Sequence, residues 1–219
     1  MLKRGLAFAL ALVMLASVSV AGATGMEIEK NGQWYTEVSA WAKDGVEKAI
    51  DLGVAYWPSR GAAKTSISRC YFAEDAAAVV ALAYGSDLAA YEGFRVLQLM
   101  RGTGDNQKYA YETLDILRGR GNGDMDFFGD ITRQEAAVML ARAYRIYCDE
   151  IHDDMEPLAY ADKNDIADWA KEDAALITHL GVMNGIGENK FDPKGVYTLE
   201  QCFVTLVRLY EKTAQGKTP

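Results

Sequence analysis

The stretch Ile131–Tyr144, ITRQEAAVMLARAY, has the pattern of a helix with a defined start. Thr132 and Glu135 form a T-x-x-E capping box, in which the two side chains satisfy free backbone N–H groups of the first turn. Arg133 lies between them, at the end of the helix where the macrodipole is positive. A cation there is unfavourable by roughly 0.3–1 kcal/mol when exposed, so some other interaction must favour Arg133.

The same helix pattern occurs three times. DAAAVVALAY, EAAVMLARAY and QCFVTLVRLY begin at Asp75, Glu135 and Gln201, which are 60 and 66 residues apart, and each ends in tyrosine. A second pattern occurs twice, as WAKDGVEKAIDLGV from Trp41 and WAKEDAALITHLGV from Trp169, 128 residues apart. Because both patterns step along the chain together, the sequence predicts a repeated unit of helix, loop and helix.

Each predicted helix has its own signals. The helix from Trp169 carries its apolar residues on one stripe, and Gly181 suits the left-handed residue that ends a helix. Thr198 and Gln201 repeat the capping box as T-x-x-Q. The loop Met183–Tyr197 is too short and irregular for a strand of its own. We therefore predict an all-α, mainly helical fold with short irregular or β-like turns.

The first 23 residues have the composition of a secretory signal peptide. Lys3 and Arg4 precede an apolar run from Gly5 to Ala16, and small residues follow up to Ala23. An uncleaved anchor helix is the alternative, but the run is shorter than the ~20 residues that a span needs. Cleavage leaves 21 Lys and Arg against 31 Asp and Glu, a net charge of −10. An anionic ligand must then meet a local basic pocket.

The cysteines and histidines give no clear site. Cys70, Cys148 and Cys202 are an odd number without CxxC spacing, which favours buried free thiols over a disulfide between any two. His152 and His179 are isolated along the chain, so we expect no metal site.

The last copy, Tyr160–Tyr210, carries a longer series of motifs. They are aromatic-x-Asp, Trp-Ala, Leu-Gly-Val, Asn-Gly and Phe-x-Pro, followed by the capped helix. In this order they resemble the S-layer homology domain, a bacterial surface repeat that usually occurs in threes. The resemblance implies three repeats in a pseudo-threefold spindle. The expected division is a signal peptide at 1–23, repeats at 24–90, 91–148 (degenerate in its first half) and 149–212, and a polar tail at 213–219.

The resemblance also implies a ligand. In that family, clefts between neighbouring repeats hold a secondary cell-wall polysaccharide with acidic groups such as a pyruvate ketal. The arginine of T-R-x-E is a main ligand contact there, and in this chain it is Arg133. A guanidinium can bind a carboxylate through two parallel hydrogen bonds. The alternative is a solvated arginine whose stem lies on a neighbour, and capping alone accounts for Thr132 and Glu135.

The other copies depart from this pattern. The position of Arg133 corresponds to Leu199 in the last copy and to Ala73 in the first. At most one or two of the three clefts therefore have the arginine that a ligand would need. Ser68 and Arg69 would restore an arginine if the first helix began earlier. The spacing to the helix that begins at Asp75 then does not fit.

Four further residues are candidate ligand contacts. Trp41 and Trp169 either pack between repeats or stack on a sugar face. Asn184 and Gly185 form a turn, and their backbone amides reach a ligand only if the loop lines the cleft.

We consider three functions. The first is a secreted anchor, held non-covalently at the cell wall or S-layer, and the second is a scaffold that binds other surface-layer proteins without binding glycan. The third, a glycosidase, needs two carboxylates in a cleft, whereas the acid-rich segment Asp149–Asp154 reads as solvated charge. We therefore predict a non-enzymatic anchor with no catalytic residues, cofactor, nucleic-acid partner or membrane association after cleavage.

Overall fold

The computed structural model describes residues 25–55, 60–84, 115–120, 124–146, 148 and 155–215. The strands are β1 (Met26–Lys30), β2 (Gln33–Val38) and β3 (Arg60–Ala62). The helices are α1 (Lys43–Asp51), α2 (Arg69–Tyr84), α5 (Arg133–Arg145), α6 (Asp168–His179), α7 (Leu199–Gln215) and the short 3-10 helix η2 (Lys163–Asp165). The predicted signal peptide, the start of the middle copy and the segment 149–154 lie outside the described residues.

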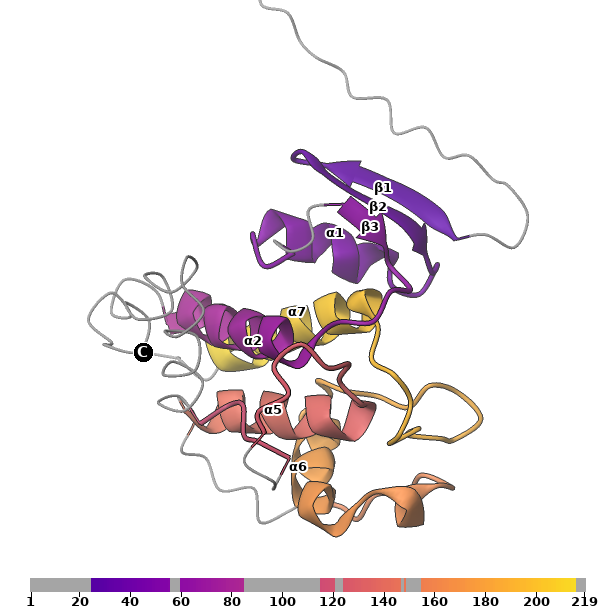
Figure 1. The fold of residues 1–219 in the computed structure, drawn as a ribbon, viewed down its shortest axis with the longest axis vertical. Coiled ribbons are helices and arrows are strands. Elements are labelled where there is room, and N and C mark those ends of the chain that lie inside the picture. Colours follow the sequence, from indigo (N-terminus) through magenta and orange to yellow (C-terminus); the bar gives the residue numbers. More distant parts are fainter. Residues whose placement is uncertain are drawn as a thin grey trace, which may run out of the picture.

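The prediction of an all-α fold is wrong, because the described residues include a three-stranded mixed sheet. Its order is β1, β2, β3, with β1 antiparallel to β2 and β2 parallel to β3. The chain between β2 and β3 forms α1, which lies directly beneath the sheet in Figure 1. The fold is therefore mixed α/β, with the sheet confined to the N-terminal part.

The sequence carried a hairpin signal ahead of the tryptophan helix. Asn31 and Gly32 both adopt positive φ, at 52° and 78°, as a two-residue type I′ turn requires. On either side, Ile28 and Tyr35 are buried and face each other across the register, while neighbouring Glu29 is exposed. This alternation has the period of a strand, which a search for helical repeats does not detect.

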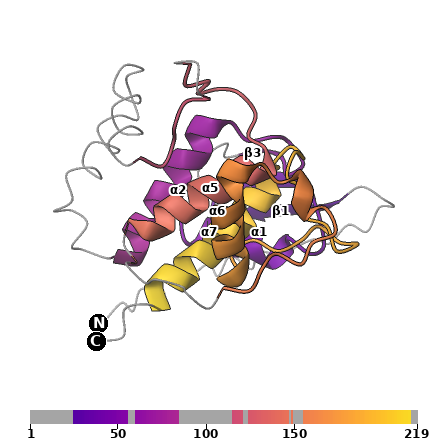
Figure 2. The same cartoon turned by 90° about the horizontal axis from the view of Figure 1, so that it is seen from below.

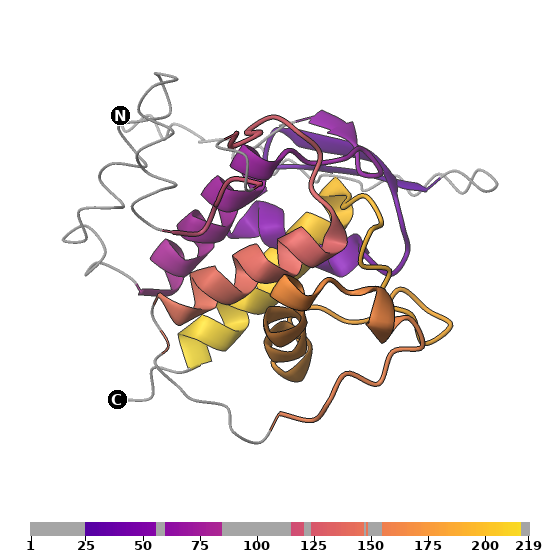
Figure 3. The same cartoon turned by 60° about the horizontal axis from the view of Figure 1, so that its bottom comes forward.

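The three long helices α2, α5 and α7 lie side by side, and α6 crosses them next to α5 (Figure 2, Figure 3). Their contact faces form one apolar core that continues under the sheet. Tyr197 is fully buried in it and meets the ring of Phe72 edge to face, with 5.5 Å between ring centroids. Tyr35 of β2 meets Phe203 of α7 in the same way at 5.2 Å, so the sheet and the helices share this core.

Three short segments, which we call the cap segments, meet just before the long helices. They are residues 66–68, 130–132 and 196–198, and each pairs with both of the others through isolated β-bridges. Backbone N–H groups at their centres donate in a closed ring: Ile67 to Tyr197 at 3.2 Å, Tyr197 to Ile131 at 2.9 Å, and Ile131 to Ile67 at 3.3 Å. The three segments therefore occupy equivalent positions around one axis.

The first two backbone N–H groups of each long helix also have equivalent acceptors. In each case the two acceptor carbonyls belong to residues two positions apart, in the loop before another cap segment. Arg69 and Cys70 donate to Gly129 and Phe127, Arg133 and Gln134 to Gly195 and Pro193, and Leu199 and Glu200 to Thr65 and Ala63. These bonds satisfy donors that a helix start leaves free. They also link the end of the chain back to its beginning.

This equivalence corrects the sequence alignment of the first copy. Arg69, not Ala73, corresponds to Arg133 and Leu199, because all three are the first residues of their helices. Ala73 lies four residues further on, buried inside α2. Four residues are close to one helical turn, so the wrong alignment places apolar residues on the same face as the right one.

None of the helices in the described part of the chain is long and apolar enough to cross a membrane.

The contact between α1 and α7 gives a test of the packing. A Cβ on Gly45 would lie 2.6 Å from Cγ2 of Val204, so we expect Gly45→Val to lower the free energy of unfolding by about 1–3 kcal/mol. Urea denaturation would measure this. Asp44→Val places the same side chain at a fully exposed neighbour and should change stability by no more than about 0.5 kcal/mol. Equal effects of the two substitutions on stability would show that Gly45 does not pack closely against Val204.

Candidate functional site

Arg133 is buried, with only 5% of the residue exposed, so it is not a solvated arginine. It is the first residue of α5, and its guanidinium donates to the backbone carbonyl of Asn184. Its Cζ lies 5.4 Å from the ring centroid of Phe191 and 5.8 Å from that of Tyr197, within the range of cation–π attraction. Its Nε is buried without a hydrogen-bond partner.

The loop that carries Asn184 is held in place by close backbone contacts. A Cβ on Gly185 would lie 2.7 Å from the carbonyl oxygen of Lys190 and 2.9 Å from the ring of Tyr160. Only glycine fits there without a shift. Asp162, from the aromatic-x-Asp motif, accepts the N–H groups of Phe191 and Asp192 at 2.8 Å each. The Asn-Gly and aromatic-x-Asp motifs therefore shape the loop that meets Arg133.

Arg133 opens onto a pocket of about 520 Å³, which we call the Arg133 pocket. It brings together four of the seven predicted site residues, namely Trp41, Arg133, Asn184 and Gly185. Its other lining residues are Lys64, Ile186, Gly187, Thr198, Glu200, Gln201, Val204, Thr205 and Arg208. Trp41 stands at this pocket and is 58% exposed, so it is available for stacking and is not part of the core.

The charge in the pocket is positive. Lys64 pairs with Glu200 at 2.5 Å, and Glu200 also accepts the N–H of Ser39 at 2.8 Å. Among the described residues no carboxylate pairs with Arg133 or Arg208, so these two cations carry uncompensated charge. A chain with a net charge of −8 over its full sequence thus holds a local cationic site. Its cations come from the first, second and third parts of the chain.

The other predicted site residues lie elsewhere. Thr132 and Glu135 form the predicted capping box: the N–H and the hydroxyl of Thr132 both donate to the Glu135 carboxylate at 2.8 Å. The capping box predicted for the last copy is only half formed: the N–H of Thr198 donates to the Gln201 side chain at 3.3 Å, but the Thr198 hydroxyl is buried without a hydrogen-bond partner among the described residues. Trp169 is 58% exposed at the start of α6 and does not line the Arg133 pocket.

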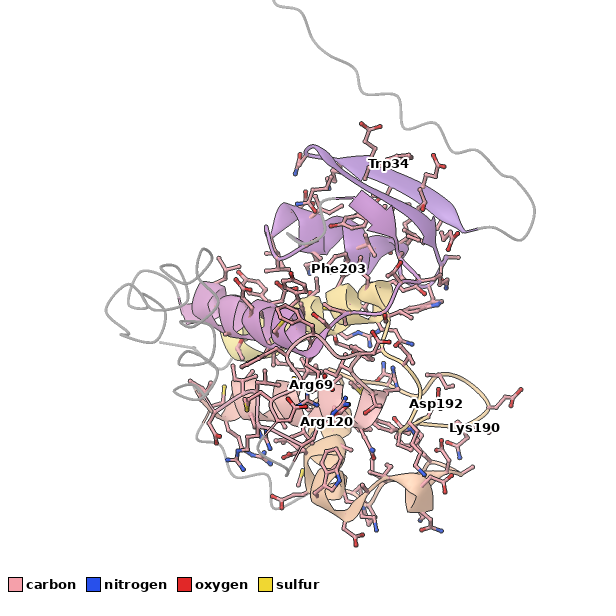
Figure 4. All side chains as sticks on the ribbon, viewed as in Figure 1. Trp34, Arg69, Arg120, Lys190, Asp192 and Phe203 are labelled. Carbon is pink, nitrogen blue, oxygen red and sulfur yellow. The ribbon has the colours of Figure 1, made fainter. Side chains whose placement is uncertain are left out.

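Glu135 joins two arginines that the sequence reading did not place at a site. It pairs with Arg69 and, at 3.1 Å, with Nε of Arg120, while Arg69 donates to the carbonyl of Arg118 at 2.7 Å. We call these four residues the Arg69 junction. Figure 4 shows Arg69 and Arg120 close together beside α5. Ser68-Arg69, read as a cap followed by its arginine, was the sequence signal for this site.

Burial alone would raise the pKa of the Glu135 carboxyl. The hydrogen bonds from Thr132 and the charges of Arg69 and Arg120 outweigh the burial, so the pKa lies below its ordinary value. Glu135 is therefore ionised at neutral pH.

The predicted burial of the cysteines is confirmed for Cys70 and Cys202, which lie among apolar residues. Cys148 is only partly buried.

Residues 159–201 match the S-layer homology domain, a non-catalytic anchoring module. The matched segment contains the loop of Asn184 and the start of α7, which form one wall of the Arg133 pocket. The sequence resemblance is thus confirmed for this segment of the chain.

The chain is also similar to parts of three bacterial enzymes. It is 32% identical over 98 residues to the exoglucanase XynX of Acetivibrio thermocellus and 31% identical over 83 residues to the amylopullulanase of Thermoanaerobacterium thermosulfurigenes. It is 28% identical over 116 residues to the endoglucanase of Bacillus sp. strain KSM-635. These regions cover 45%, 38% and 50% of this chain but only 9%, 4% and 12% of the enzymes.

The low pKa of Glu135 predicts an acid-dependent loss of stability. The folded pKa lies below the ordinary value of 4.5, so the ionised carboxylate stabilises the fold above that pH, and the contribution is lost as the pH falls through the folded pKa. At pH 7 we expect Glu135→Gln to cost about 1–3 kcal/mol. The difference from the wild type should shrink steadily below pH 4.5 in denaturant titrations. A difference that does not depend on pH would show that the charge of Glu135 is not stabilising.

Proposed function

We propose that the chain is a cell-surface anchor that holds an acidic secondary cell-wall polysaccharide non-covalently in the Arg133 pocket. The observation that carries this proposal is a buried guanidinium without an anionic partner among the described residues. Burying a charge costs free energy unless it is paired. An anionic group of a ligand would supply the missing partner and would bond to the free Nε.

The walls of the pocket suit a sugar acid better than a small inorganic anion. Trp41 offers an exposed aromatic face at the pocket, and Asn184 and Gly185 offer backbone groups. Aromatic faces and a few fixed polar groups around one charge are the usual composition of a small-molecule site. A carboxylate such as a pyruvate ketal would bind Arg133 while the sugar ring lies against Trp41.

The three cap segments support three tandem S-layer homology repeats, of which residues 159–201 are the one matched directly. On this basis the chain would be secreted through its N-terminal signal peptide and retained at the cell wall or S-layer without catalytic activity of its own. The similar enzymes share only a small part of their length with it. A scaffold that contacts other surface-layer proteins is the alternative.

The first test compares Arg133→Ala with Arg145→Ala, which removes an exposed arginine at the other end of the same helix. The assay is co-sedimentation with cell-wall sacculi of the producing organism, with and without their secondary polymer. We expect the wild type and Arg145→Ala to pellet only with intact sacculi. Arg133→Ala should bind roughly tenfold to a hundredfold more weakly, because it loses charge-assisted hydrogen bonds of about 1.5–3 kcal/mol.

Two outcomes would contradict the proposal. If the two variants pellet equally, Arg133 does not contribute to binding. If the wild type fails to pellet with any sacculi, glycan binding is absent, and the scaffold is the better explanation.

The two tryptophans form a second matched pair, because each lies at the start of a helix, just before α1 or in the first turn of α6, and both are 58% exposed. Trp41 lines the Arg133 pocket and Trp169 does not. We expect Trp41→Ala to weaken binding to sacculi by about 0.5–1.5 kcal/mol, the usual contribution of an aromatic contact beyond its area. Trp169→Ala should bind like the wild type. A larger loss of binding from Trp169→Ala than from Trp41→Ala would show that the sugar contact lies in a different cleft.

A further inference from the structure

Arg69 and Arg133 occupy the same structural position, although only Arg133 lines the pocket described above. Each is the first residue of its helix, and each N–H donates to a glycine carbonyl in the next loop, Gly129 at 3.1 Å or Gly195 at 2.9 Å. Each guanidinium also donates to a loop carbonyl, that of Arg118 for Arg69 and that of Asn184 for Arg133. The two arginines therefore differ in their surroundings and not in their placement.

The difference lies in the third residue of the following helix. For Arg69 this residue is Glu135, the third residue of α5, and for Arg133 it is Gln201, the third residue of α7. Both side chains accept the N–H of their own cap residue, at 2.8 Å and 3.3 Å. Glutamate and glutamine therefore perform the same capping role, and only glutamate brings a negative charge.

That charge is used at the Arg69 junction. The Glu135 carboxylate pairs with Arg69 and with Arg120, and it also accepts two hydrogen bonds from Thr132. These contacts fill the acceptor capacity of a carboxylate. A ligand carboxylate at Arg69 would have to displace Glu135. At Arg133 no carboxylate of the described residues takes this place. The Nε of both arginines is buried without a hydrogen-bond partner, so the two sites differ in the carboxylate and not in Nε.

We propose that Glu135 acts as a built-in anion that closes the Arg69 junction, and that neutral Gln201 leaves Arg133 open to an acidic ligand. This inference rests on the proposed function, because it names the residues that select one junction over the other.

The test exchanges the two residues. The variants are Gln201→Glu, Glu135→Gln and the double exchange, and the probe is a synthetic hexosamine carrying a pyruvate ketal, titrated by calorimetry. The wild type should bind one equivalent through Arg133. Gln201→Glu should weaken this binding at least roughly tenfold, because the new carboxylate pairs with Arg133. Glu135→Gln should raise the stoichiometry to two, and the double exchange should bind one equivalent at Arg69.

A stability measurement shows whether the new pair forms, independently of the ligand. Gln201→Glu should raise the melting temperature if its carboxylate reaches Arg133, and Arg133→Ala should abolish that gain. Since Gln201 already caps α7, Glu135→Gln is expected to fold, and circular dichroism would check this. If Glu135→Gln does not fold, Gln201→Glu alone decides the proposal.

The outcomes separate the two proposals. If the wild type binds the probe, Arg133→Ala does not, and Gln201→Glu binds as tightly as the wild type, the closing role of the third residue is wrong and the proposed function stands. A folded Glu135→Gln that still binds one equivalent would overturn the closure of the Arg69 junction. A wild type that does not bind the probe would overturn the proposed function and this inference together.

Discussion

The fold depends on the closed ring of backbone hydrogen bonds among Ile67, Ile131 and Tyr197. Each cap segment contributes one donor and one acceptor, so none of the three can be paired without both others. The ring fixes where α2, α5 and α7 begin. The first side chain of each helix is thereby placed at a junction between parts of the chain that are about sixty residues apart. The Arg133 pocket and the Arg69 junction are both consequences of this placement.

The net charge of the protein and the local charge of the Arg133 pocket have opposite signs. The protein as a whole is acidic, which repels polyanions at distances up to the Debye length of about 10 Å. Inside the pocket, Arg133 and Arg208 act over a few ångströms and in partial shelter from water. Under the proposed function, this combination would favour a polymer that carries isolated acid groups on a largely neutral backbone over one with dense charge. It also shows how a cationic pocket can exist on an acidic protein.

The helices and the main arginine could be predicted from the sequence, because capping boxes and apolar stripes are local signals. Thr132 and Glu135 cap as expected, and Gln201 accepts the N–H of Thr198. The alignment of the first copy could not be settled in this way. A shift of four residues preserves the apolar face, and only the backbone contacts of Arg69 distinguish the two alignments. The sheet was missed for a different reason, since Asn31-Gly32 precedes the first helical repeat and has strand periodicity.

The pocket as a whole was beyond sequence reasoning. Lys64 and Arg208 come to Arg133 from positions roughly seventy residues away on either side. Lys64 belongs to no motif, and Arg208 lies in a repeated helix pattern that gives no reason to place it at a site. Only the closed ring brings them together. Pocket residues that lie outside the motifs can therefore be identified only once the equivalence of the cap segments is known.

The cyclic arrangement separates the unit of sequence recognition from the unit of folding. The matched segment 159–201 ends at the third residue of α7, before the helix has buried most of its apolar face against α1 and α2. Excised alone, it would expose that start of α7 and the unpaired cap segment 196–198 to water. The segment that is recognised by its sequence is therefore smaller than the unit that buries its own core.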